Sequence, residues 1–134
     1  MPLHPLYDPA DSSLQPVGST ALRRVNLHSQ DTGLQVMVLH MDPHHMYDYI
    51  LDDCSGIISF TVISGCLYIE TLDESKSPHI SQHRLTPGCV LLLPRNIYRK
   101  TYTMDAPAVY VEHIENGFRP DLRVKRQSSK NEQS

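Results

Sequence analysis

Alternating apolar and polar residues in the middle of the chain predict two strand-turn-strand units. In the first unit, every second residue is apolar on both sides of a Ser-Gly turn: Ile58, Phe60, Val62, Leu67 and Ile69. This period of two around a glycine is typical of a hairpin with one buried face. The second unit has Pro87-Gly88, an apolar strand over residues 89–93, a turn at residues 94–96 and a further strand. We therefore predict two hairpins of similar construction.

The rest of the chain also favours strands. Further strands are expected over residues 34–39, 46–53, 79–85 and 108–115. Both alternating faces of residues 34–39 are partly apolar, which favours a sheet that is covered on both sides. No long amphipathic helical pattern stands out. The predicted fold class is all-β, with one barrel or sandwich domain.

The two ends of the chain differ from the middle. Residues 1–20 contain four prolines and little periodicity, which indicates an irregular N-terminal arm. Residues 121–134 are basic and polar with almost no apolar content, so we expect a disordered tail. The predicted barrel domain spans residues 21–120.

Net charge, hydropathy and cysteine spacing argue against several classes of protein. The 134 residues carry a net charge of −3, which argues against a general nucleic-acid binder. No apolar run approaches the ~18 residues of a membrane span, and the first residues lack the pattern of a signal peptide. Three widely spaced cysteines favour reduced thiols over disulfides or a zinc ribbon. We expect a cytoplasmic protein with no membrane and no nucleic-acid partner.

The spacing of the two central units resembles the cupin family of small metal-binding barrels. The first cupin motif carries two His and a Glu ahead of a glycine, and Gly65 matches that glycine. The resemblance then places the two His positions on Leu51 and Asp53, and the Glu position on Ile58. The fold that the resemblance implies is a cupin-type barrel, or jelly roll.

The second cupin motif carries its metal-binding His five residues after a proline. Pro94 matches that proline, so the His position falls on Arg99. A permanent cation at this position, and an apolar residue at the Glu position, remove donor atoms and add positive charge. We therefore expect neither a metal nor another cofactor in the usual place.

A longer series of short matches resembles the WbuC type of cupin-fold protein, which is associated with bacterial surface-polysaccharide gene clusters. The matching pieces are residues 23–28, residues 34–37, Gly65, Pro94, Val111-Glu112 and residues 116–118. Together they span about residues 21 to 120. The resemblance implies a role in O-antigen or capsule synthesis. Members of that family are described as metalloproteins, from which this chain departs at the metal positions.

Ligand-binding candidates follow from the inward positions of the aligned strands and from the family-like segment 23–28. They are Arg99, Asp53, Tyr49, Phe60, Arg24, Asn26, His28 and Glu112. Arg99 can form a buried salt bridge with Asp53 or Glu112, or it can bind an anionic ligand. Both can hold if Arg99 exchanges its carboxylate partner for the carboxylate or phosphate of a ligand. No catalytic residue is assigned.

Three functions are consistent with these residues. The leading hypothesis is a metal-free cupin that binds or modifies an anionic sugar or sugar nucleotide, with metal-free isomerase-like or epimerase-like activity if it is an enzyme. The second is a structural or regulatory protein whose barrel is filled by its own side chains, leaving no void larger than a few waters. The third is a shifted metal site built from His28, Asp53, Cys54 or His40. In each case we expect a homodimer, because edge strands and the proline-rich arm favour pairing.

Overall fold

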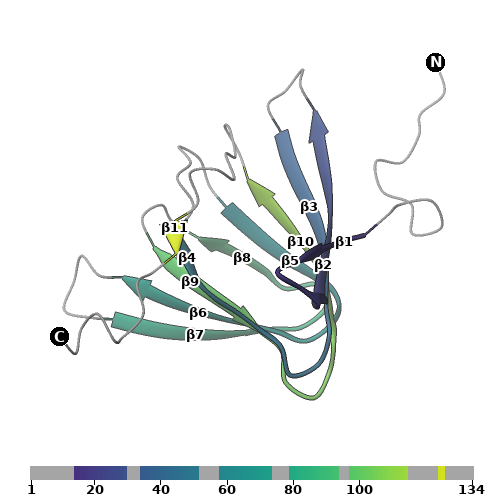
Figure 1. The fold of residues 1–134 in the computed structure, drawn as a ribbon. Helices are drawn as coiled ribbons and strands as arrows, with labels where there is room; N and C mark the ends of the chain where they lie inside the picture. Colours follow the sequence, from purple (N-terminus) through teal and green to yellow (C-terminus); the bar gives the residue numbers. More distant parts are fainter. Residues whose placement is uncertain are drawn as a thin grey trace.

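The computed structural model describes residues 14–29, 34–51, 58–73, 79–93, 97–114 and 124–125. Every regular element in these segments is a β-strand, and the strands form two antiparallel sheets (Figure 1). The predicted all-β fold class is confirmed.

Six strands form the first sheet, in the order β1-β2-β3-β10-β5-β8. Their bounds are Gln15–Val17 (β1), Ser19–Ser29 (β2), Leu34–Met41 (β3), Ala108–Ile114 (β10), Ile58–Gly65 (β5) and Val90–Leu93 (β8). Five strands form the second sheet, in the order β11-β4-β9-β6-β7. Their bounds are Val124–Lys125 (β11), Met46–Leu51 (β4), Tyr98–Tyr102 (β9), Leu67–Asp73 (β6) and His79–Leu85 (β7).

The two predicted hairpins are wrong, although their strands exist. β5 lies in the first sheet between β10 and β8, whereas β6 lies in the second sheet between β9 and β7. The second unit divides in the same way, with β8 in the first sheet and β9 in the second. An alternating pattern shows which face of a strand is buried, but the same pattern results when consecutive strands pair with each other or cross between sheets.

Gly65 makes the crossing from β5 to β6 possible. Its φ is +80°, in the left-handed region that glycine adopts without steric cost. A Cβ at this position would lie 1.8 Å from the carbonyl oxygen of Pro107. The amide of the next residue, Cys66, donates a hydrogen bond to that same oxygen at 3.3 Å. The turn is therefore held against the start of β10 at a distance that only glycine allows.

A register shift changes the direction of side chains along β4. The pairing of β4 with β9 is irregular between Tyr47 and Ile50. As a result Tyr47 and Ile50 both line the interior, although they are three residues apart. The predicted inward position of Tyr49 is wrong, because this irregularity turns its side chain to the outer face of the sheet.

Short strands occur in two regions where none was predicted. β1 and the start of β2 lie within the expected N-terminal arm, and β11 lies within the expected tail. β1 occupies the edge of its sheet, where Pro16 does not remove a hydrogen bond from a central ladder. Val17 packs against the core, which explains why this segment is ordered.

The hydrophobic core lies between the two sheets. Its largest fully buried side chains come from strands of both sheets: Tyr110, Phe60, Leu22, Met37, Met41, Leu67 and Ile69. On β3, Met37, Leu39 and Met41 are buried in this core, so Val38 and His40 lie on the outer face.

The position of His40 on this outer face can be tested by measuring how the stability of the protein depends on pH. Burial, and then the charge of Arg23, lower the pKa of His40 below 6.5. The unfolded chain therefore binds a proton at His40 more readily than the folded chain, and stability falls as the pH drops from 6.5 through the lower folded pKa. We expect wild type to lose more stability than His40→Gln over this range, as measured by urea unfolding at several pH values. Parallel pH curves for the two proteins would contradict the assignment.

Candidate functional site

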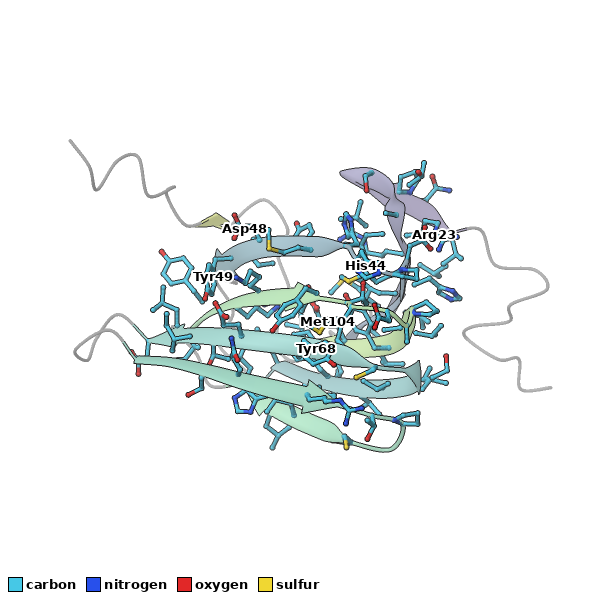
Figure 2. The ribbon with its side chains drawn as sticks, turned by 90° about the horizontal axis from the view of Figure 1, so that it is seen from below. Arg23, His44, Asp48, Tyr49, Tyr68 and Met104 are labelled. Carbon is cyan, nitrogen blue, oxygen red and sulfur yellow. The ribbon has the colours of Figure 1, made fainter. Side chains whose placement is uncertain are left out.

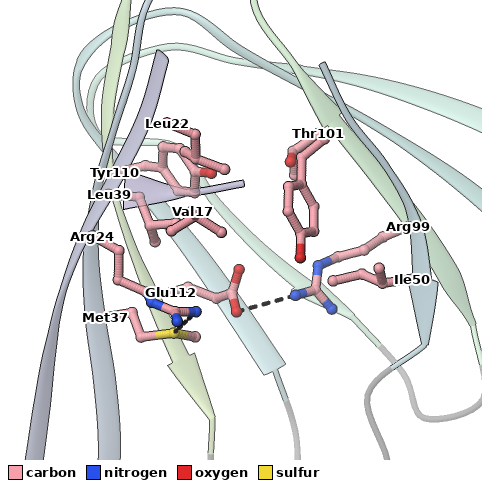
Figure 3. A pocket seen from close by; sticks show the side chains of 11 residues that line it. Val17, Leu22, Arg24, Met37, Leu39, Ile50, Arg99, Thr101, Tyr110 and Glu112 are labelled. Carbon is pink, nitrogen blue, oxygen red and sulfur yellow. Dashed lines mark hydrogen bonds and ion pairs between the residues drawn. The ribbon is translucent and has the colours of Figure 1, made fainter. Parts of the chain in front are cut away.

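Two guanidinium groups and one carboxylate meet inside the barrel. Arg24 comes from β2, Arg99 from β9 and Glu112 from β10, and all three point inward (Figure 3). Arg99 and Glu112 alternate along their strands with less buried neighbours, so their inward direction follows from the strand period. Arg99 Nη2 donates a hydrogen bond to Glu112 Oε2 at 3.1 Å.

The Arg99–Glu112 pair is almost completely removed from water. The exposed fractions of the two side chains are 3% and 5%. The Arg99 guanidinium carbon also lies 5.1 Å from the centre of the Phe60 ring, in cation–π geometry. A charge buried to this extent is tolerated only when it has a partner. Of the two salt-bridge partners proposed from sequence, Glu112 is the one that the structure shows, and Asp53 lies outside the described residues.

Arg24 is held less firmly. Its Nη1 lies 3.9 Å from Met37 Sδ, a long contact with a weak acceptor. Arg24 is half-buried rather than buried. Figure 3 shows the Glu112 carboxylate between the guanidinium groups of Arg24 and Arg99. With all three groups ionised, this part of the interior carries one net positive charge.

The space beside these charged groups is small. The cavity measures about 10 Å³, which is enough for about one water molecule. Besides polar and aromatic side chains, five apolar ones line it: Val17, Leu22, Met37, Leu39 and Ile50. Tyr47, Ile50 and Thr101 were not among the sequence candidates. For Ile50 the reason is the irregular register of β4, which could not be read from the alternating pattern. Tyr110 lines the same cavity, so it and Glu112 both point inward.

The other candidates have different locations. Phe60 is fully buried in the core, as is Ile58 beside it. The Tyr49 hydroxyl donates a hydrogen bond to Glu70 Oε2 on the outer face of the second sheet. The side chains of Asn26 and His28, like Asp53, are outside the described part of the chain. Their predicted ligand-binding roles stay predictions.

The residues present do not fit a divalent metal at the usual cupin position. Ile58 offers no donor atom, and Arg99 is a permanent cation. Among the described residues, no group of three or more His, Cys, Asp and Glu side chains lies close enough to hold a metal ion. Of the residues considered for a shifted site, His40 lies on the outer face of β3, and Asp53 and Cys54 are outside the described residues.

A second space between the sheets was not anticipated from the sequence. It has a volume of about 270 Å³ and follows the seam where the edge strands β7 and β8 approach each other. Apolar residues form most of its lining, with His83, Asp73 and Thr71 as the polar members.

Solved structures of similar fold include cupin-fold proteins. The cupin domain of Schizosaccharomyces pombe Cnp3 is 17% identical, with a TM-score of 0.61 over 82% of this chain and 73% of that chain. KdgF from Halomonas sp. is 14% identical, with a TM-score of 0.66 over 86% of this chain and 96% of that chain. CapF, solved with the inhibitor 3-isopropenyl-tropolone, is 14% identical, with a TM-score of 0.71 over 87% of this chain and 35% of that chain.

These similarities establish the fold, and the protein has a cupin fold. No family model matches the sequence. No curated protein matches it either. Among the described residues, no helix is long and apolar enough to cross a membrane.

Proposed function

We propose that this cupin-fold protein binds a small anionic ligand without a metal, through the guanidinium groups of Arg24 and Arg99. The observation that carries the proposal is the placement of two arginines around one buried carboxylate inside the barrel. Among the described residues that line this interior, two guanidinium groups face one carboxylate, and a carboxylate or phosphate of a ligand would balance the remaining positive charge. Arginine suits this role because its planar fork of donors matches both anions.

Binding requires that Arg24 moves. The cavity of about 10 Å³ does not hold a sugar acid or a nucleotide. Arg99 keeps its buried pair with Glu112. Arg24 is half-buried, and its described hydrogen bond goes to a weak acceptor, Met37 Sδ. An outward turn of Arg24 would enlarge the space and present its donors to the ligand, leaving Arg99 and Glu112 as the fixed inner part of the site.

The proposed ligand class is a sugar acid or a sugar nucleotide of bacterial surface-polysaccharide synthesis. Its anionic character follows from the two arginines, and its sugar character rests on the resemblance to WbuC-type proteins. We propose binding rather than turnover. An acid–base pair of the metal-free isomerase type needs a His in the cavity, and of the described histidines His40 and His113 lie on outward positions of β3 and β10.

A filled structural or regulatory barrel is the second candidate. The observation in its favour is the same cavity, which at about 10 Å³ leaves no more room than one water beside Arg99. In this case the Arg99–Glu112 pair serves only to satisfy two buried charges, and the barrel interior binds nothing.

Thermal-shift measurements with Arg24→Ala distinguish the two candidates. We expect the melting temperature of wild type to rise with at least one of glucuronate, galacturonate, UDP-glucose, UDP-glucuronate and inorganic phosphate, because ligand binding to the folded state stabilises it. Arg24→Ala should lose most of this rise. Arg24→Ala is a better variant than Arg99→Ala, which would leave Glu112 buried without its partner.

Arg23→Ala is the matched control. Arg23 is the next residue on β2, faces the opposite side, and pairs with Asp42 at 2.7 Å in a partly exposed salt bridge. It should keep the full ligand response. If none of the five ligands moves the melting temperature of wild type, the anion-binding proposal is wrong and the filled barrel is favoured.

A further inference from the structure

We propose that the outer face of the second sheet is a binding platform for a saccharide chain. The platform is separate from the barrel interior, and it does not rest on the function proposed above. It consists of two neighbouring rows of side chains that cross the sheet from β4 to β7.

The aromatic row is fixed by the register of the sheet. Met46 lies opposite Tyr102, Tyr102 opposite Tyr68, and Tyr68 opposite Arg84. Because side chains directly opposite on neighbouring strands stand close together, these four form one line across four strands. The rings of Tyr68 and Tyr102 are stacked, with 5.2 Å between their centres and 13° between their planes. Arg84 stands beside the row because it lies directly opposite Tyr68, and a hydrogen bond with the Tyr68 side chain raises the pKa of Arg84.

The polar row runs parallel to the aromatic row, two residues further along each strand. Glu70 lies opposite Lys100 on one side and Gln82 on the other. Glu70 Oε2 accepts a hydrogen bond from the Tyr49 hydroxyl and pairs with Lys100 Nζ at 3.2 Å, while Glu70 Oε1 accepts one from Gln82 Nε2 at 3.0 Å. Lys100 Nζ also lies 5.1 Å and 5.9 Å from the ring centres of Tyr49 and Tyr102.

These contacts hold the polar groups in place before any ligand arrives. The side chains of Glu70 and Lys100 are only 12% and 22% exposed, although they stand on the outer face of a sheet. Their hydrogen-bonding capacity is not exhausted. An ammonium has three donors and a carboxylate about four acceptor sites. Among the described residues Glu70 has three such contacts and Lys100 has one, which leaves capacity on both groups. A fixed site with free capacity binds at a lower entropic cost than a flexible one.

A groove of about 420 Å³ lies beside these rows, at the start of β4 and the end of β9. Glu70, Lys100 and Tyr102 line one side of it, and Met46 and Met104, each about half exposed, line the rest with His44 and His45. Figure 2 shows His44, Tyr68 and Met104 on this side of the molecule. The groove offers flat apolar surface and hydrogen-bonding groups side by side.

A saccharide matches both properties. A pyranose ring has an apolar face of C–H groups that packs on an aromatic ring, and hydroxyl groups around its edge that both donate and accept. Tyr68 and Tyr102 cover one face of each other's ring by stacking, so a sugar would pack on Tyr102, which lines the groove, with its hydroxyl groups toward Glu70 and Lys100. Nucleic acid is a poorer match, because the chain carries a net charge of −3.

Affinity electrophoresis with soluble polysaccharides tests the platform. The native protein is run through gels that contain hydroxyethylcellulose, barley β-glucan, xylan, galactomannan or dextran. We expect at least one of them to retard wild type, and Tyr102→Ala to raise the apparent dissociation constant for it at least about tenfold. Tyr102→Phe keeps the ring and should stay within about threefold of wild type.

Two control variants test whether substitutions outside the platform also change the retardation by polysaccharides. Leu92→Ala removes an apolar side chain that is 61% exposed on the first sheet, and it should be retarded like wild type. Val90→Ala, also on the first sheet and 59% exposed, should be retarded like wild type too. The proposal is overturned if none of the five polysaccharides retards wild type, or if Tyr102→Ala and Leu92→Ala have equal effects. An unchanged circular dichroism melt of Tyr102→Ala shows that the variant is folded.

Discussion

Replacing Gly65 with Ala should be among the most damaging single substitutions in this protein. The added Cβ would lie 1.8 Å from the Pro107 carbonyl oxygen, a backbone atom that cannot move without shifting the start of β10. The φ of +80° adds the strain of a left-handed L-residue. We expect the free energy of unfolding to fall by at least about 4 kcal/mol, which is in the exceptional range for one substitution. Urea unfolding followed by circular dichroism measures this loss.

Gly88→Ala is the matched control for Gly65→Ala. The φ of Gly88 is +90°, and no atom lies within 4 Å of the place where its Cβ would stand. This variant should lose only the conformational part, about 1 to 2 kcal/mol. Equal losses in the two variants would show that the close approach to Pro107 does not determine the turn between the sheets.

Removing the Glu112 carboxylate should have a similarly large effect. Glu112→Leu leaves the Arg99 guanidinium buried without its partner, and breaking a buried ion pair from one side costs about 3 to 5 kcal/mol. The double variant Arg99→Met with Glu112→Leu removes both charges, so we expect it to recover most of this loss. Urea unfolding of wild type, the two single variants and the double variant gives the coupling between the two residues.

An exposed pair provides the comparison for Glu112. Asp42 pairs with Arg23 at 2.7 Å, but its side chain is 50% exposed. Asp42→Ala should therefore cost no more than about 1 kcal/mol. If Glu112→Leu costs as little as Asp42→Ala, Arg99 is not a buried charge that depends on Glu112.

The sequence predicted which residues face the interior better than it predicted which strands pair. Phe60, Arg99 and Glu112 point inward as expected, because strict alternation fixes the face of a side chain once one residue of the strand is placed. The pairing of β5 with β6 was predicted from Gly65 and is wrong. A glycine with positive φ is needed in a hairpin and in a crossing between sheets alike, so the residue does not distinguish them.

Tyr49 shows the limit of alternation within one strand. An irregular register between Tyr47 and Ile50 reverses the two faces of β4, and no residue in this segment marks it. The outer platform was missed for a related reason. The contacts of Tyr68, Glu70, Tyr102 and Lys100 depend on the neighbours of β6 and β9 in the sheet, which the alternating pattern does not identify. The expected homodimer stays a prediction.

The central claim is that Arg24 and Arg99 together bind an anion inside the barrel. Nuclear magnetic resonance of the arginine side-chain Nε–Hε groups, titrated with UDP-glucuronate and separately with glucuronate, tests it most directly. With at least one of them, the resonances of Arg24 and Arg99 should shift together, saturate at the same concentration and leave Arg23 unchanged. If neither ligand moves the resonances of Arg24 and Arg99, or if Arg23 moves as much as they do, the barrel interior is not the anion-binding site.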